Sequence, residues 1–180
     1  MPRAALREGA FSTSSVQPEH IEAIRVWRNA QMSILRQNGP ISSDDQIAYF
    51  DREVWPDKKK NHPKNLLLIY RRDKTVIGYG GLVHISWPDS RAEVSFLVDP
   101  EIRADSSEYA LAFETWLGLM KTLAFDDLKL RRLTTETYMT RSQNLAVLEK
   151  AGFVREGVLR DHIVIDGTMH DSILHGMNKR

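Results

Sequence analysis

The segment from Ala92 to Tyr109 constrains the fold most, because it joins a strand to a helix across a proline. Ala92–Val98 alternates polar residues with β-branched and aromatic ones, which is typical of a strand. Asp99–Pro100 ends that strand, since proline has no amide hydrogen to donate. Ser106–Ser107 can cap a helix, and a carboxylate at Glu108 suits its first turn. We predict a strand, a short loop and a helix whose amides face the loop, an arrangement that binds phosphates.

Hydrophobic periodicity predicts further elements on both sides of this segment. The predicted helices are Glu19–Ala30, one capped at Ser42 that runs to Val54, Ser106–Asp126 and Ser142–Lys150. The predicted strands are a short one near Leu6, Asn65–Tyr70, Val76–Ile85, Ala92–Val98, Leu130–Thr137, Val154–Ile165 and Thr168–Met177. The last two form a hairpin over Asp166–Gly167, a strong turn signal. We expect one α/β (α+β) domain over residues 1–180, with a mixed, mostly antiparallel sheet of six or seven strands and helices on both faces.

Composition excludes several classes of function. The chain has no cysteine, so disulfides, a cysteine acyl-enzyme and thiolate metal sites are all excluded. Its net charge of +1 creates no general field for nucleic acid or membrane surfaces. Met1–Gly9 lacks an apolar secretory core, and no apolar run reaches transmembrane length. We expect a cytoplasmic protein with neither nucleic acid nor membrane as a partner.

The late part of the chain carries its most specific motif. Asn144–Phe153 reads N-L-A-V-L-E-K-A-G-F, and Glu156–Asp161 reads E-G-V-L-R-D. These residues resemble the E-K-x-G-F helix end and the E-G-x-L-R segment of the GCN5-related N-acetyltransferase (GNAT) superfamily, in its branch of ribosomal-protein and amino-sugar N-acetyltransferases. Trp27–Asn29 is a weaker match, and the resemblance covers Ile21–Met177. The resemblance implies the GNAT fold and an N-acetyltransferase that uses acetyl-CoA as co-substrate.

The family's pyrophosphate loop has the pattern Arg/Gln-x-x-Gly-x-Gly/Ala, which aligns here from Arg103. Ser106 and Glu108 stand at its glycine positions. Glycine lets a backbone approach a pyrophosphate closely; serine still offers its amide and a hydroxyl, whereas Glu108 brings a negative charge near a negative ligand. The resemblance implies coenzyme binding by Arg103, Ser106 and Ser107.

Four further positions are expected to hold the coenzyme. The resemblance implies that the strand near Leu97 and Val98 splays from its neighbour, so that their amides serve as oxyanion and pantetheine donors. Arg141 stands where the family has an asparagine at a helix start, and Asn144 follows one turn later. Arg141 is expected to meet a coenzyme phosphate.

Acetyl transfer to an amine needs a base, donors for the thioester oxygen and, at most, an acid for the thiolate. Glu93 is our first candidate for the base, with a cross-strand ion pair as its alternative role. Glu136 is second and His84 third. Many family members have a tyrosine acid where this chain has Leu148, so Tyr138 is the candidate substitute.

No metal site is expected. The three late histidines, His162, His170 and His175, lie near Asp161 and Asp171, but their spacing matches no usual ligand pattern. Strand alternation would also divide them between the two faces of a sheet.

Two functions stay open. The first is acetyl transfer to a small primary amine, with a nucleotide-linked amino sugar as the favoured acceptor because the basic segment Trp55–Lys64 could contact a phosphate; a protein N-terminal amine is the rival acceptor. The second is a non-catalytic binding module on the same fold, supported by the residues that replace the glycines and the tyrosine. A homodimer remains open as an alternative to a monomer.

Overall fold

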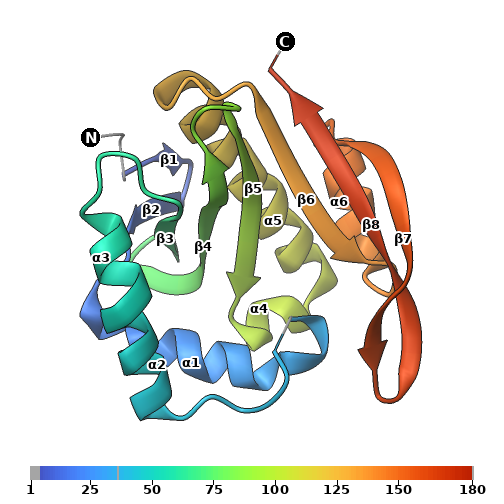
Figure 1. Cartoon of the computed structure of the whole chain (residues 1–180), viewed down its shortest axis with the longest axis horizontal. Helices are drawn as coiled ribbons and strands as arrows, with labels where there is room; N and C mark the ends of the chain where they lie inside the picture. Colours follow the sequence, from blue (N-terminus) through green and yellow to red (C-terminus); the bar gives the residue numbers. More distant parts are fainter. Residues whose placement is uncertain (1–4, 36, 180) are drawn as a thin grey trace.

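The computed structural model describes residues 5–35 and 37–179, and within them the strands form one mixed sheet of eight strands in the order β1-β2-β3-β4-β5-β6-β8-β7 (Figure 1). The strands are β1 (Arg7–Glu8), β2 (Phe11–Ser15), β3 (Leu66–Arg72), β4 (Thr75–Ser86), β5 (Arg91–Val98), β6 (Arg132–Tyr138), β7 (Val154–Ile165) and β8 (Thr168–Asn178). The helices are α1 (Ile21–Ala30), α2 (Ser43–Tyr49), α3 (Trp55–Lys58), α4 (Pro100–Ala104), α5 (Ser106–Lys121) and α6 (Ser142–Lys150). The fold class therefore agrees with the sequence prediction.

One pair of strands is parallel, and it is the pair that opens. β5 and β6 pair only from Arg91–Glu93 to Arg132–Thr134, whereas every other neighbouring pair in the sheet is antiparallel. Beyond these residues the two strands diverge, as Figure 1 shows between the labels β5 and β6. The splay implied by the family resemblance is therefore present.

Each face of the sheet has its own apolar core. On the α5 face, Trp116 is fully buried, and the rings of Phe96 and Phe113 stack at 4.7 Å between centroids. On the other face, a smaller cluster joins Ile24 of α1 and Phe50 to Ile69 of β3. Burial of this apolar surface is the main force that holds helices to both faces.

Helix α1 is tied to the end of β5 by two side chains. The Trp27 indole donates to Asp99 Oδ2 at 3.0 Å, and Gln31 Nε2 donates to the carbonyl of Val98 at 2.8 Å. Asn29, from the weakly matching motif, accepts from the amide of Ile41 and donates to its carbonyl. This motif therefore positions α1 and the segment leading to α2 beside the opening between β5 and β6.

The structure differs from the prediction in three elements. The sheet has eight strands instead of six or seven, because Arg7–Glu8 and Phe11–Ser15 both join its edge. The expected loop after Pro100 contains the short helix α4, which Asp99 caps through the amide of Glu101. The predicted basic loop begins as helix α3, with Pro56 in its first turn, where a missing amide hydrogen costs nothing.

The cap of α5 also differs from the prediction. Asp105 is the N-cap, and Ser106 and Ser107 are the first residues of the helix. An ionised carboxylate accepts from two amides at once, which favours Asp105 over a serine in this role.

Among the residues described, no helix is both long and apolar enough to cross a membrane. The predicted single domain includes residues 1–4, 36 and 180, which lie outside the described residues.

Candidate active site

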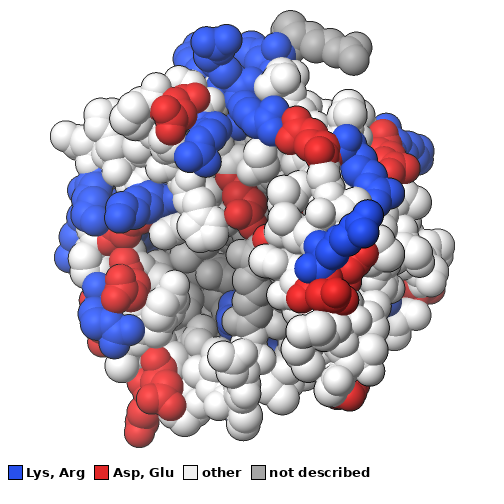
Figure 2. All heavy atoms as spheres, turned by 45° about the vertical axis from the view of Figure 1, so that its right-hand side comes forward, with Lys and Arg blue, Asp and Glu red and all other residues white. Residues whose placement is uncertain are grey.

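The divergence of β5 and β6 creates a cleft of about 280 Å³. Its wall includes charged and polar side chains from five elements and the loop before α6, namely Arg28, His84, Glu93, Glu136, Tyr138, Arg141 and Asn144. Figure 2, in which the β7–β8 side is turned forward, shows a hollow in this face with acidic side chains at its rim. The predicted catalytic residues Glu93, Glu136 and Tyr138 therefore meet in one cleft.

Glu93 lies at the last paired position of β5, beside the point where the strands part. Its Oε2 lies 3.1 Å from Nδ1 of His84 on β4, and the side chains of Glu93 and His84 are 27% and 65% exposed. The sequence offered Glu93 two roles, base or partner of a cross-strand cation. Its cross-strand partner is a histidine, so Glu93 can pair with His84 and also act as the base.

Glu136 and Tyr138 reach the cleft from β6. Nε2 of His162 on β7 lies 3.5 Å from Oε1 of Glu136, whose side chain is only 13% exposed. Tyr138 and His162 also line a wider groove of about 790 Å³, which lies between two stretches before α2, residues 32–35 and 37–39, and the β7–β8 hairpin. Tyr138 is therefore shared between the cleft and a groove that opens toward solvent.

The predicted backbone donors follow the cleft toward α4. Ser95 and Phe96 line the cleft, whereas the side chains of Leu97 and Val98 are buried beside it. The backbone amide of Asp99 donates to the carbonyl of Ile77 in β4 at 2.9 Å. Because successive amides of a strand point to opposite sides, the amide of Leu97 points toward β4 as well, and those of Phe96 and Val98 point toward the opening.

A second cavity, of about 430 Å³, adjoins the cleft and carries two arginines. It shares Ile34, Arg141 and Asn144 with the cleft and is also lined by Arg103. Nη1 of Arg103 and Nε of Arg141 are buried and have no hydrogen-bond partner among the described residues. Burial, and then the neighbouring Arg141 guanidinium, lower the pKa of Arg103, but an arginine stays charged at neutral pH.

The side chains around Arg141 form a short chain of hydrogen bonds. Arg141 Nη2 donates to the hydroxyl oxygen of Tyr109 at 3.0 Å, and the Tyr109 hydroxyl donates to Asn144 Oδ1 at 2.9 Å. Tyr109 and Asn144 are buried, so they fix the position of Arg141 at the edge of both cavities. Leu148, at the position of the family's tyrosine, is fully buried and lines the cleft.

The first turn of α5 is occupied by its own cap. Asp105 Oδ1 accepts from the amides of Ser107 and Glu108 at 2.9 and 3.0 Å. Glu108 points away and pairs with Arg72 at 2.9 Å. Hydrogen bonds from the Glu108 amide and from Ser107 hold the pKa of Asp105 below its ordinary value. A carboxylate therefore takes the amide of Ser107, which was predicted to bind a phosphate, together with the amide of Glu108.

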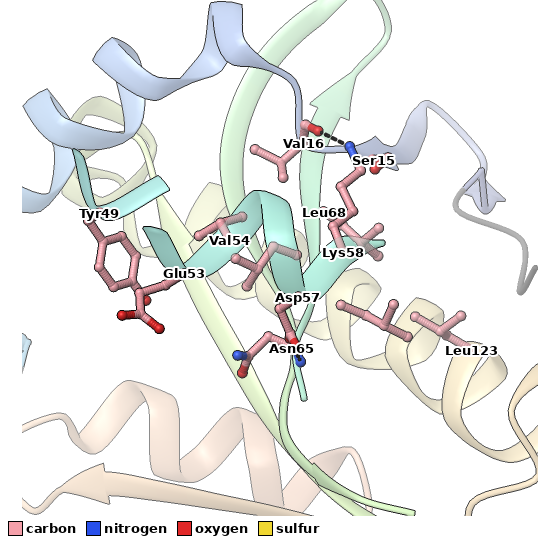
Figure 3. Close-up of a pocket in the computed structure, with 12 residues that line it drawn as sticks. Ser15, Val16, Tyr49, Glu53, Val54, Asp57, Lys58, Asn65, Leu68 and Leu123 are labelled. Atoms are coloured by element: carbon pink, nitrogen blue, oxygen red, sulfur yellow. Dashed lines mark hydrogen bonds between the residues drawn. The ribbon is translucent and has the colours of Figure 1, made fainter. Parts of the chain in front are cut away.

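The start of the basic segment lines a different pocket, in which Figure 3 labels Asp57 and Lys58. Lys58 donates to the carbonyl of Val16 at 2.7 Å, marked by the dashed line, beside a small pocket of about 70 Å³. Lys60 pairs with the buried Asp57 at 3.1 Å. No residue of 55–64 lines the cleft, so this segment gives a nucleotide-linked acceptor no support.

The late histidines are separated from one another. His162 faces Glu136, His170 lines the arginine-bearing cavity, and His175 is buried with Nε2 3.7 Å from Glu149. Among the described residues, no three His, Asp or Glu side chains come together in a group that could hold a metal ion.

Sequence reasoning missed the role of Asp105 and the partners of the two glutamates. Asp105 stands directly before the predicted helix, and aspartate is a preferred N-cap, so this signal was readable. The pairing of His162 with Glu136 depends on the register of β7 across β8, which no local pattern contains.

Comparison with known proteins adds the family. Residues 14–174 match the family described as "Acetyltransferase (GNAT) domain". YdaF of Bacillus subtilis (strain 168), a candidate ribosomal N-acetyltransferase, is 25% identical over 108 residues, which are 60% of this chain and 56% of YdaF. The match therefore spans little more than half the length of that relative.

Two solved structures share the fold. The spermidine N-acetyltransferase of Vibrio cholerae, in complex with CoA and spermine, superposes with a TM-score of 0.80 at 17% identity, over 95% of this chain and 96% of that one. A probable GNAT-family acetyltransferase of Chromobacterium violaceum ATCC 12472 has a TM-score of 0.76 at 21% identity, over 99% and 92% of the two chains.

Proposed function

Since this chain belongs to the GNAT acetyltransferase family, as its sequence predicted, we propose that it moves an acetyl group from acetyl-CoA directly to a primary amine. The observation that carries the proposal is the cleft between β5 and β6, which brings two carboxylates and a tyrosine beside the opening of the sheet. The cysteine-free sequence supports direct transfer, because no thiol is present to form an acyl-enzyme.

Three side chains of the cleft and two backbone amides of β5 have proposed roles. Acetyl-CoA supplies an activated acetyl thioester when bound. Glu93 accepts a proton from the incoming ammonium, and the amides of Phe96 and Val98 stabilise the oxyanion. Tyr138 donates a proton to the departing sulfur. Glu136 attracts the cationic acceptor from the adjoining groove.

The residues present fit the coenzyme in part. The narrow cleft suits a pantetheine arm, and the unpaired guanidinium nitrogens of Arg103 and Arg141 suit a phosphate in the adjoining cavity. The first turn of α5 does not fit, because Asp105 already occupies its amides. We therefore propose that Arg103 and Arg141 hold the phosphates, with Asn144 supporting Arg141 through Tyr109.

The proposed acceptor is a small primary amine, with a protein N-terminal amine as its rival. Transfer within the family to spermidine, as in the Vibrio cholerae enzyme, favours the former, and the relation to YdaF favours the latter. The groove beside the β7–β8 hairpin, with its volume of about 790 Å³, has room for either class.

The Asp105 cap favours a second candidate function, a module that has kept the fold and lost the donor site. A carboxylate at the helix N-terminus repels the diphosphate that other family members bind there. This candidate predicts no binding of acetyl-CoA at millimolar concentration.

Titration calorimetry with acetyl-CoA separates the two candidates, with free phosphate as a control. Saturable binding supports the enzyme. A panel of polyamines, amino sugars and short peptides is then assayed with a thiol reagent, which detects only released CoA because the protein has no cysteine. Glu93→Gln should abolish release while leaving the coenzyme affinity unchanged. Binding with no turnover on any amine would contradict the enzyme.

A further inference from the structure

The backbone of His84 is held in a conformation that histidine seldom adopts. Its φ is +50°, in the left-handed region. The register between β4 and β5 shifts between Val83 and Ser86, so His84 lies in a β-bulge. In bulges of this type the left-handed position is usually a glycine, because a side chain is strained there. A strained residue beside a cleft is a reason to look for a function.

Neighbouring residues hold the bulge in place. The amide of His84 donates to Asn65 Oδ1 at 3.2 Å, and the amide of Ile85 donates to the carbonyl of Lys64 at 2.9 Å. Asn65 is itself fixed, since its backbone amide donates to Oδ2 of the buried Asp57 at 2.9 Å. The position of the imidazole is therefore determined from outside the strand.

The bulge directs the imidazole of His84 to Glu93. Nδ1 lies 3.1 Å from Glu93 Oε2. An ionised carboxylate only accepts hydrogen bonds, so Nδ1 carries the proton and Nε2 is left for water. The side chain of Glu93 is 27% exposed and that of His84 is 65% exposed, so the pair leads from the cleft to solvent.

We propose that His84 is a positioning residue for Glu93, because its Nδ1–H donates to the carboxylate and fixes the orientation in which Glu93 takes the proton of the acceptor. This inference rests on the proposed acetyl transfer. The acceptor R–NH₃⁺ loses one proton to Glu93, and the amine nitrogen then attacks the thioester carbon. As the C–N bond forms and the C–S bond breaks, Tyr138 protonates the departing sulfur and takes up the second proton from the nitrogen. The products are the acetamide, CoA-SH and one proton, which Glu93 releases to water.

The other charged groups of the cleft lie on different elements. Arg28 comes from α1, Glu136 and Tyr138 from β6, and Arg141 from the start of α6. Glu136 has its own histidine partner, His162, at 3.5 Å. In the described chain His84 is therefore the histidine that faces Glu93.

The first test needs no ligand. ¹⁵N spectra of the imidazoles at alkaline pH, with His84 assigned by comparison with His84→Gly, show which ring nitrogen carries the proton. We expect Nδ1–H in the wild type and a change to Nε2–H, the form preferred by free histidine, in Glu93→Met, which keeps the bulk of the side chain without an acceptor. An Nε2–H ring in the wild type would overturn the proposal.

The second test measures turnover with a matched control. His84→Gly keeps the left-handed backbone and removes the ring; Asp73→Gly relieves the same strain, at φ +54°, in the exposed β3–β4 turn. We expect kcat to fall about 10- to 100-fold in His84→Gly, with KM for acetyl-CoA unchanged, and to recover several-fold with added imidazole. Asp73→Gly should keep the wild-type kcat and show no response to imidazole.

The results separate failure of the positioning role from failure of the proposed function. An active wild type whose His84→Gly variant keeps kcat within about twofold and ignores imidazole would refute the positioning role alone. A wild type that turns over no amine would refute the acetyl transfer and the positioning role with it, whatever the spectra show.

Discussion

Asp105 Oδ1 accepts a hydrogen bond from the backbone amide of Glu108 at 3.0 Å, so the first turn of α5 already holds a negative charge. Anions are normally attracted to this end of a helix by its unpaired amides and its dipole. At the N-terminus of α5, the carboxylate of Asp105 takes the position of such an anion. For the proposed acetyl transfer, we therefore expect the coenzyme phosphates to bind in the arginine-bearing cavity instead.

Asp105→Gly should strengthen the binding of acetyl-CoA. The change frees the amides of Ser107 and Glu108 and removes a like charge, and glycine is still an acceptable N-cap. One charge-assisted hydrogen bond corresponds to about a tenfold lower Kd, measured by calorimetry. Glu108→Gln is the control. Because Glu108 points away from the first turn and pairs with Arg72, this variant should keep Kd within about twofold of the wild-type value. Unchanged affinity in Asp105→Gly would mean that the diphosphate never approaches this turn.

Arg141→Ala should weaken acetyl-CoA binding about tenfold or more. The substitution removes the guanidinium whose Nε is proposed to bind a coenzyme phosphate. Pantetheine has no phosphate and should bind the variant as it binds the wild type. Arg91→Ala is the matched control, since Arg91 is exposed and pairs with Asp89. An equal loss for pantetheine would show that Arg141 only supports the shape of the cleft.

The sequence was sufficient for the fold because local signals agreed with one another. Alternation marked β5, Pro100 ended it, and Asp166–Gly167 fixed the last hairpin, which the structure reproduces. The edge of the sheet was less readable. A short strand near Leu6 was predicted, but Phe11–Ser15 was not, because its run of serine and threonine is typical of a loop and it is a strand only through its pairing with β3.

The site was predicted as a set of residues but not as a set of partners. Glu93, Glu136 and Tyr138 share a cleft because strand alternation put them on one face, which can be read from sequence. The contact of His84 with Glu93 requires a one-residue bulge, and alternation cannot place a bulge. Tertiary register, rather than residue type, decides such pairs.

Glu136→Gln should raise KM for the amine acceptor about 10-fold while the Kd of acetyl-CoA stays constant. Glu136 contacts His162, which lines the wide groove together with Tyr138. We therefore expect the charge of Glu136 to act on a cationic acceptor in the groove rather than on the coenzyme. Initial rates over a range of amine concentrations give this KM. Glu114→Gln, which removes a similar ion pair with Lys150 on the far side of the sheet, should change neither constant. A fall in kcat alone would place Glu136 in the chemical step instead.

Asp57 links the stability of the protein to pH. Its burial opposes ionisation, but the amides of Lys64 and Asn65 and the ammonium of Lys60 outweigh this and hold the pKa of Asp57 below its ordinary value. The folded state therefore favours the ionised carboxylate. Its contribution to stability is complete above the unfolded pKa, about 3.9, and is lost as pH falls through the lower folded pKa.

Asp57→Asn should lower the free energy of unfolding by about 1–2 kcal/mol at pH 7, or roughly 2–8 °C in Tm for a chain of this size. The difference from the wild type should shrink below about pH 4, where the native carboxylate also loses its charge. Thermal unfolding between pH 7 and pH 3 measures both effects, with Asp51→Asn, an exposed site, as the control. A difference that stays constant over this range would mean that the hydrogen-bonding geometry of Asp57, and not its charge, holds Asn65 and the His84 bulge.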